Sequence, residues 1–265
     1  VNSMEFGTDG LRGSVPSVIH PALAWALGKA TVEVFGTLVL LARDTRISGP
    51  HLEKATLLGI QSAGGMGVAC GVLPTPALSA LVPRRRAKAG LMITASHNPP
   101  EDNGLKLLGP NGAKPDRSQL QELSQRLTDH LPLAPEIPPP PEDISEDEVF
   151  ADYLDALFTM LPRRTRLSGL KIGLDCANGA ARRTAPLALT ELGAQVRVWN
   201  DGSGRAIKFD PRSRPIPALP HEVIVMLHGF FPPQRFLPYL SWLELDQLQD
   251  KANTVIVLPV GAIEQ

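Results

Sequence analysis

Apolar and polar positions along this chain follow two alternating patterns. Residues three or four apart repeat as apolar in some segments, as on one face of a helix, and short apolar runs separate these segments. Helices are predicted at residues 21–34, 51–63, 77–81 and 119–130, and strands at 38–42, 68–72 and 90–95. Strands alternating with helices at this spacing indicate βαβ units, and therefore an α/β fold with a mostly parallel or mixed sheet.

The pattern restarts after a proline-rich, acidic stretch at residues 135–148, which we interpret as a stiff, solvated linker. Helices are predicted at 150–161 and 180–192, and strands at 171–175 and 195–199. Eight prolines lie between Pro211 and Pro259, so little regular structure is expected there. We therefore expect an αβα sandwich domain with a mixed sheet at 1–134, the linker, an incomplete second α/β unit at 149–209 and a tail at 210–265.

The composition excludes several classes of partner. With 26 Lys and Arg against 27 Asp and Glu, the net charge of −1 gives no field that attracts nucleic acid or an anionic membrane. No apolar run is long enough to span a membrane, and the N-terminus lacks a signal-peptide pattern. Cys70 and Cys176 lie in apolar contexts and form no CxxC pair, so both are predicted to be buried free thiols. A reducing, cytoplasmic location is expected.

The strongest candidate for chemistry is Ser96, which directly follows the predicted strand at 90–95 and precedes His97, Asn98 and two prolines. Open α/β sheets place their ligands at the carboxyl ends of strands. A hydroxyl group on a rigid turn suits covalent phosphoryl or acyl transfer. Taken alone, a Ser-His pair is more often an ordinary polar turn, so its sequence context decides between the two interpretations.

Four polar clusters accompany Ser96, at residues 5–13, 43–46, 102–106 and 175–179. We interpret 102–106 as a turn that presents Lys106, and 175–179 as a junction between a strand and a helix. Each cluster alone is typical of a surface turn. Together they supply glycine-turn N–H groups and fixed cations, the groups with which proteins hold phosphate.

Six motifs occur in a fixed order. They are FGTDGLRG at 6–13, DTRISG at 44–49, GVLPTPA at 71–77, TASHNP at 94–99, DNGLK at 102–106 and LDCANGA at 174–180. Through them, residues 4 to about 205 resemble the α-D-phosphohexomutase family, most closely its phosphoglucosamine mutase branch. TASHNP together with FGTDGLRG makes this resemblance highly specific.

The resemblance implies that Ser96 carries a phosphoryl group, donates it to a hexose monophosphate and takes one back from the other end of the sugar. Glucosamine 6-phosphate would become glucosamine 1-phosphate through a bisphosphate intermediate, in amino-sugar metabolism. Glucosamine or glucose 1,6-bisphosphate would be the primer. Specificity for mannose or glucose phosphates remains an alternative.

The same resemblance assigns roles to the residues around Ser96. Arg12 and Lys106 match positions that surround the phosphoserine, where both stabilise charge on its oxygens. His97 matches either a general acid/base or a residue that orients the loop. Asn98 flanks Ser96, and Thr8 belongs to the phosphate loop that carries Arg12.

The chain departs from the family at the metal. The family binds Mg²⁺ through the phosphoserine, here Ser96, and three aspartates of a D-G-D-G-D-R loop that this sequence lacks. Residues 201–205 resemble that loop superficially but supply one carboxylate, so we interpret them as a turn. The family's third and fourth domains also have no counterpart. We expect a truncated or recombined product that is inactive alone, and a non-catalytic fragment or half of a split mutase is the alternative. The expected partner is a second copy of the chain, in a homodimer, or a complementing C-terminal half.

The tail carries two weaker resemblances. Residues 235–240 and 257–265 are similar to the start of a creatininase-type amidohydrolase, in which Glu264 would match a metal ligand. One ligand does not make a metal site. Residues 223–230 resemble the oxyanion turn of an α/β-hydrolase, but the chain contains no G-x-S-x-G sequence, which excludes that interpretation.

Overall fold

The structure is a computed structural model that describes residues 6, 10–96, 98–139, 147–199, 223–225 and 255–259. The α-helices of this part are α1 (Pro21–Phe35), α2 (Gly49–Ser62), α3 (Thr75–Arg84), α4 (Arg117–His130), α5 (Asp147–Met160) and α6 (Thr184–Glu191). Two short 3₁₀ helices are η1 (Leu131–Leu133) and η2 (Ala180–Arg182). The strands are β1 (Leu11–Ser14), β2 (Leu38–Arg43), β3 (Met66–Val72), β4 (Ala89–Ile93), β5 (Asp102–Leu108), β6 (Lys171–Asp175), β7 (Gln195–Trp199), β8 (Val223–Val225) and β9 (Val255–Pro259).

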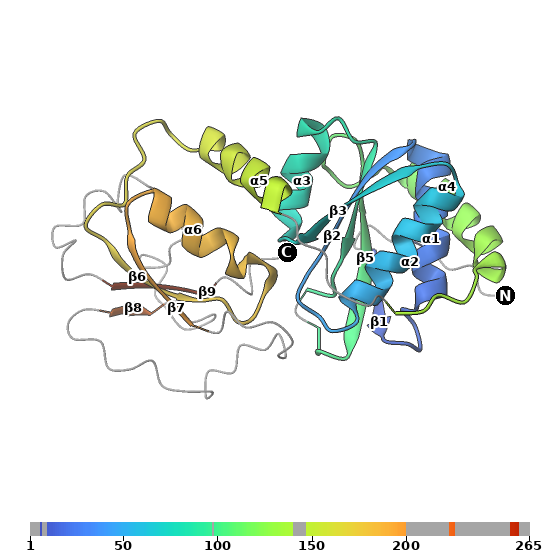
Figure 1. The fold of residues 1–265 in the computed structure, drawn as a ribbon, viewed down its shortest axis with the longest axis horizontal. Coiled ribbons are helices and arrows are strands. Elements are labelled where there is room, and N and C mark those ends of the chain that lie inside the picture. Colours follow the sequence, from blue (N-terminus) through green and yellow to red (C-terminus); the bar gives the residue numbers. More distant parts are fainter. Residues whose placement is uncertain are drawn as a thin grey trace.

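The first sheet is mixed, as predicted, with the strand order β1-β5-β4-β2-β3. Strand β2 pairs in parallel with both β3 and β4, whereas β5 runs antiparallel to β4 and to β1. Helices cover both faces of this sheet, as Figure 1 shows. The parallel strands bring the carboxyl ends of β2 and β4 to the same edge, where the residues that follow them meet.

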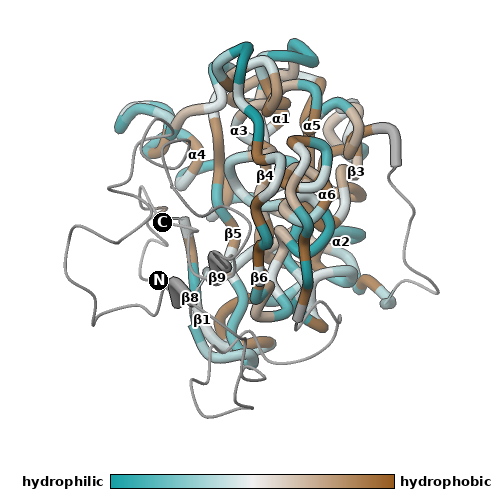
Figure 2. Tube along the Cα trace, turned by 90° about the vertical axis from the view of Figure 1, so that its left-hand side faces the viewer, coloured by the Kyte–Doolittle hydropathy of each residue, from teal (hydrophilic) through white to brown (hydrophobic). Residues whose placement is uncertain are grey.

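Alternation along the strands separates two cores. On β4, Leu91 and Ile93 belong to the core that also contains buried residues of α1, α2 and α4. Met92, between them, belongs to the core on the opposite face with residues of α3 and α5. The strand is apolar along its length, and its brown trace in Figure 2 reflects burial on both faces. This arrangement is the predicted αβα sandwich.

Two glycines let α1 and α2 pack closely. A Cβ atom on Gly59 would lie 1.9 Å from the carbonyl oxygen of Trp25, and one on Gly28 would lie 2.3 Å from that of Thr56. Any larger side chain would push the helices apart.

The second unit contains a parallel sheet of order β7-β6-β9-β8. Strands β8 and β9 come from the predicted tail, and β9 lies between β6 and β8. Helix α5 packs on α3 of the first domain, where Tyr153 is buried and the Arg85 Nε lies 2.8 Å from Asp152 Oδ2. Residues 201–205 and Glu264, about which the sequence made predictions, lie outside the described residues.

Three predictions about local structure were wrong. Residues 102–106 form the start of strand β5, where a turn was expected, because they pair with β1 and β4. The helix expected at 180–192 is divided into η2 and α6. The linker is not solvated at its start: Ile137 is buried in the first core, and its carbonyl oxygen lies 2.7 Å from His51 Nε2.

Cys70 and Cys176 are both buried, as predicted, and within the described part of the chain neither forms a disulfide bond. Among the described residues, no helix is long and apolar enough to cross a membrane.

Candidate active site

Ser96 lies three residues beyond the end of β4, with 7% of its surface exposed. Its φ of +57° is in the left-handed region, which residues with a side chain rarely adopt. Such a conformation persists only where the surrounding structure holds it, and it is found preferentially at functional sites. The groups that hold the backbone of Ser96 are therefore the next feature to identify.

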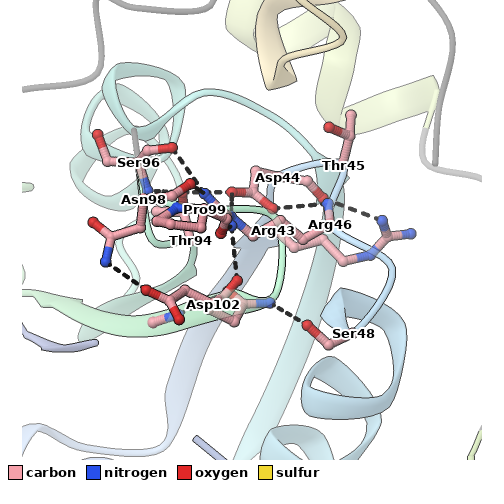
Figure 3. Close-up of polar contacts among 12 residues, drawn as sticks. Arg43, Asp44, Thr45, Arg46, Ser48, Thr94, Ser96, Asn98, Pro99 and Asp102 are labelled. Atoms are coloured by element: carbon pink, nitrogen blue, oxygen red, sulfur yellow. Dashed lines mark hydrogen bonds and ion pairs between the residues drawn. The ribbon is translucent and has the colours of Figure 1, made fainter. Parts of the chain in front are cut away.

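Two side chains connect the backbone of Ser96 to the end of β2 (Figure 3). The Ser96 N–H donates to Thr94 Oγ1 over 2.9 Å, and the Thr94 hydroxyl donates to Asp44 Oδ2 over 2.6 Å. Asp44 is the first residue after β2, and its own N–H donates to the carbonyl of Ile93. The ends of the two parallel strands are thus joined by side chains as well as by the sheet.

Arg46 is buried beneath the loop that follows Ser96. Its Nε donates to Asp44 Oδ2 over 3.0 Å. Its two terminal nitrogens donate to four backbone carbonyl oxygens, those of Pro99 (2.6 Å), Asp102 (2.7 Å), Ser96 (2.9 Å) and Asn98 (3.0 Å). Because a guanidinium has five N–H donors, all five of Arg46 are engaged.

Asp44 balances the charge of Arg46. The Asp44 and Arg46 side chains are 2% and 1% exposed, and the Asp44 carboxylate also accepts from the Arg46 backbone N–H over 3.0 Å. Burial raises the pKa of the Asp44 carboxyl above its usual value, and hydrogen bonds from Thr94 and Arg46 oppose that shift. A nearby second pair, Arg43 with Glu53 of α2, is also buried, with 2.8 Å between Arg43 Nε and Glu53 Oε2. The predicted phosphate-binding cluster at 43–46 therefore holds its two cations in buried ion pairs.

Arg12 and Lys106 lie on one face of the sheet, next to the end of β4. Arg12 of β1 pairs with Gly104 of β5, and Lys106 follows two residues later on β5. Paired residues in antiparallel strands point to the same face, as do residues two apart on one strand. A Cβ on Gly104 would lie 3.0 Å from Arg12 Cγ and 2.4 Å from the carbonyl oxygen of Thr94, so this glycine leaves room for the arginine beside the Ser96 loop.

Arg12 carries a donor without a partner. Its Nε is buried and makes no hydrogen bond within the described part of the chain. A buried donor of a permanently charged group is costly to leave unpaired, and an anion such as a phosphoryl group would satisfy it. Arg12 is therefore a candidate to pair with an anion beside the Ser96 loop.

The remaining predicted site residues divide into two groups. Asn98 donates its side-chain N–H to Asp102 Oδ2 over 2.9 Å, which closes the loop on itself. Thr8 and His97 lie outside the described residues. The sequence did not single out Asp44, Arg46 and Thr94 as the residues that hold Ser96, although a polar Asp-Thr-Arg run directly after an apolar strand was a usable signal.

The described residues offer no ligand set for a metal ion. They contain no group of three or more His, Cys, Asp or Glu side chains placed to hold one. Asp44, the acidic side chain joined to Thr94, already accepts three hydrogen bonds. The residues described at this loop therefore do not fit Mg²⁺, which needs several free oxygen ligands.

The second unit contacts the same turn. Thr45, between Asp44 and Arg46, donates its hydroxyl to the carbonyl oxygen of Asn178 over 2.5 Å. Asn178 and its neighbour Ala177 both have positive φ, at 55° and 45°, and the Ala177 N–H donates to Asp175 Oδ1 over 2.9 Å. The turn after β6 is thus held in a defined conformation against the turn after β2.

Comparison with known proteins identifies this arrangement. Residues 3–132 match the family described as phosphoglucomutase/phosphomannomutase, alpha/beta/alpha domain I. A phosphoglucosamine mutase from Magnetococcus marinus is 42% identical over 205 residues, which are 72% of this chain and 41% of that protein. One from Methylobacterium nodulans is 39% identical over 228 residues, which are 82% of this chain and 50% of that protein. The chain spans about half the length of the curated relatives it matches.

Solved structures agree with the sequence comparison. A putative phosphomannomutase from Thermus thermophilus superposes with a TM-score of 0.62 at 25% identity, over 74% of this chain and 45% of that one. A phosphoglucomutase/phosphomannomutase family protein from Burkholderia thailandensis gives a TM-score of 0.59 at 27% identity, over 75% of this chain and 44% of that one. With its mixed five-stranded sheet between two helical layers and its serine loop at the end of β4, the chain belongs to the phosphohexomutase family, whose domain I it contains.

Proposed function

We propose that this chain performs the phosphoryl-carrier step of a phosphohexose mutase, with Ser96 as the carrier. The observation that supports this most directly is the conformation of Ser96, left-handed at the end of β4 with its N–H and carbonyl both hydrogen-bonded. The neighbouring Arg12 has a buried donor free for an anion. Hexosamine phosphates are the proposed substrates, because the relatives named above are phosphoglucosamine mutases.

The proposed reaction is an in-line transfer between two oxygens. The Ser96 hydroxyl oxygen forms a bond to the phosphorus of a hexose bisphosphate, the bond from that phosphorus to the sugar oxygen breaks, and the serine proton ends on the sugar oxygen. In the reverse step, the phosphoserine gives its phosphoryl group to the 1-hydroxyl oxygen of glucosamine 6-phosphate, whose proton returns to the serine oxygen, and the 1,6-bisphosphate forms. Transfer of the 6-phosphoryl group of that bisphosphate to Ser96 then leaves glucosamine 1-phosphate. Catalysis of such a transfer consists mostly of positioning and charge stabilisation.

Each predicted residue has a place in this reaction. Arg12 and Lys106 stabilise the charge on the equatorial phosphoryl oxygens, and Asn98 keeps the loop closed through Asp102. His97 is proposed as the acid/base that moves the serine proton, and Thr8 as part of the phosphate loop. The reaction is proposed for the cytoplasm.

Phosphoryl transfer to Ser96 is the first test. The purified chain is incubated with glucose 1,6-bisphosphate, followed by intact mass and peptide mapping. We expect one added phosphoryl group on Ser96, none in Ser96→Ala, and normal labelling in Ser79→Ala, a serine on α3 whose hydroxyl bonds to the carbonyl oxygen of Gly112. Labelling at another residue, or equal labelling of Ser96→Ala, would refute the carrier assignment.

A coupled assay for glucosamine 1-phosphate, run with Mg²⁺ and a bisphosphate primer, tests the complete reaction, and glucose and mannose 6-phosphates test its specificity. Activity that appears only after a separately expressed C-terminal half is added would favour a split mutase. Hexose phosphate binding without labelling of Ser96 would favour a non-catalytic fragment.

A further inference from the structure

We propose that Arg46 is a positioning residue that holds Ser96 in the conformation in which it accepts a phosphoryl group. This inference rests on the proposed carrier function of Ser96. Arg46 does so through the backbone of the loop, since all of its donors go to carbonyl oxygens and to Asp44.

The four carbonyls that Arg46 contacts span the entire loop. They belong to Ser96, Asn98 and Pro99 and to Asp102, the first residue of β5. The loop is therefore folded around one planar guanidinium, as Figure 3 shows. A lysine ammonium has three donors on a single atom and cannot reproduce this planar pattern.

Arg46 and Thr94 fix Ser96 from both sides of its Cα atom. Thr94 Oγ1 accepts from the Ser96 N–H, and Arg46 donates to the Ser96 carbonyl. These two bonds restrain the backbone torsions that keep Ser96 at a φ of +57°. If the carbonyl is released, the residue can return to an ordinary backbone region, which turns the Cα–Cβ bond and moves the hydroxyl away from the in-line position.

Arg46 is thus separated from substrate binding. Its side chain is 1% exposed, and no N–H remains for a phosphate or a sugar hydroxyl. A change at Arg46 should therefore reduce the rate of transfer and leave the affinity for the phosphoryl donor nearly unchanged. A phosphate-binding arginine would show the opposite split.

The matched control is Arg43, three residues earlier in the same segment. It is as deeply buried as Arg46, and its ion pair with Glu53 joins β2 to α2. Its Nη1 also donates to the carbonyl oxygen of Asp44 over 3.5 Å, so its substitution removes a second buried guanidinium of the same turn. Arg43→Lys therefore reports what the loss of such a group costs in stability.

The experiment measures phosphorylation of Ser96 against glucose 1,6-bisphosphate concentration. For Arg46→Lys we expect a maximal rate lower by about 100-fold, a typical effect of misplacing a reacting group, with half-saturation changed by less than about 2-fold. For Arg43→Lys we expect a lower melting temperature and a rate within about 2-fold of the original. A rate for Arg46→Lys equal to that of Arg43→Lys, or a raised half-saturation at an unchanged maximal rate, overturns the proposal.

A second variant covers the case in which Arg46→Lys does not fold. The double substitution Asp44→Asn with Arg46→Gln removes the buried pair together, so no charge is left unpaired, and it also lacks the planar donor set. It should fold and show the same loss of maximal rate. A folded double variant with the original rate overturns the proposal.

A measurement that does not depend on phosphorylation separates the positioning role of Arg46 from the carrier function of Ser96. Hydrogen exchange at the amide of Ser96 should speed up in Arg46→Ala, and added guanidinium ion should restore protection where sodium chloride at equal ionic strength does not. If the original chain accepts no phosphoryl group, the carrier function fails, and this rescue alone decides the role of Arg46. Unchanged exchange in Arg46→Ala, or equal rescue by sodium chloride, refutes the positioning role.

Discussion

The left-handed conformation of Ser96 makes an unusual prediction: replacing this serine by glycine should give a more stable protein than replacing it by alanine. Both substitutions remove the hydroxyl group, so its contacts cancel in the comparison. What differs is the backbone. Glycine adopts a φ of +57° without strain, whereas alanine retains the clash between its Cβ and the backbone that serine also has.

The magnitude follows from two opposing terms. The left-handed region costs an L-residue about 1–2 kcal/mol, which glycine avoids. Glycine also makes the unfolded chain more flexible, which costs about 0.4–1 kcal/mol relative to alanine. At the centre of these two ranges, Ser96→Gly is more stable than Ser96→Ala by about 0.8 kcal/mol, or has a melting temperature higher by about 2 °C for a chain of this size.

Urea unfolding followed by circular dichroism measures this difference in stability. Neither variant has a hydroxyl group at position 96, so phosphorylation there does not affect the comparison. Ala95→Gly is the neighbouring control, because Ala95 is fully buried and has no positive φ. At position 95, replacing alanine by glycine should therefore lower the free energy of unfolding. If Ser96→Ala is as stable as Ser96→Gly or more so, the loop does not hold Ser96 under strain, and the reasoning about its positioning is refuted.

Two further predictions concern contacts away from the loop. Thr45→Val should lower the free energy of unfolding by about 1 kcal/mol and speed hydrogen exchange at residues 174–180, because the bond to the Asn178 carbonyl is lost; Thr165→Val, on an exposed turn, is the control, and unchanged exchange at 174–180 would contradict the contact. At the start of α4, hydrogen bonds from Gln119 and Ser118 lower the pKa of the Asp116 carboxyl from its usual value of 3.8. The original chain should therefore be more stable than Asp116→Asn above pH 3.8, and this difference in the free energy of unfolding should disappear as the pH falls through the lowered pKa. Urea unfolding across this acidic range measures it, and a constant difference would show that the carboxylate is not the source.

The sequence predicted the elements whose pattern is local. Helices α1 and α2 and strands β2 and β4 appear close to their expected positions, because apolar periodicity alone distinguishes them. Strands β1 and β5 were missed. Their residues, such as Gly13, Asn103 and Gly104, are typical of turns, and they become strands through antiparallel pairing of segments far apart in the sequence. Gly104 is needed there for the space beside Arg12, which no propensity reveals.

The candidate site shows the same division. Ser96, Arg12 and Lys106 are predicted from motifs, since each carries a side chain suited to phosphoryl chemistry. Arg46 was grouped with cations that bind phosphate, and the structure gives it another task. Its partners are backbone carbonyls, which carry no sequence signal, so only the folded loop shows that its donors are all engaged.

The Asp44-Thr45-Arg46 turn joins three parts of the molecule through three consecutive side chains. Asp44 accepts from Thr94 at the end of β4, Thr45 donates to Asn178 of the second unit, and Arg46 holds the Ser96 loop. Because these residues are adjacent and buried, the turn cannot shift at Thr45 without moving the groups that fix Ser96. The position of the second unit and the conformation of the serine loop are therefore coupled through one rigid turn. If Ser96 carries the phosphoryl group as proposed, the second unit would affect that transfer by keeping the Asp44–Arg46 pair in place.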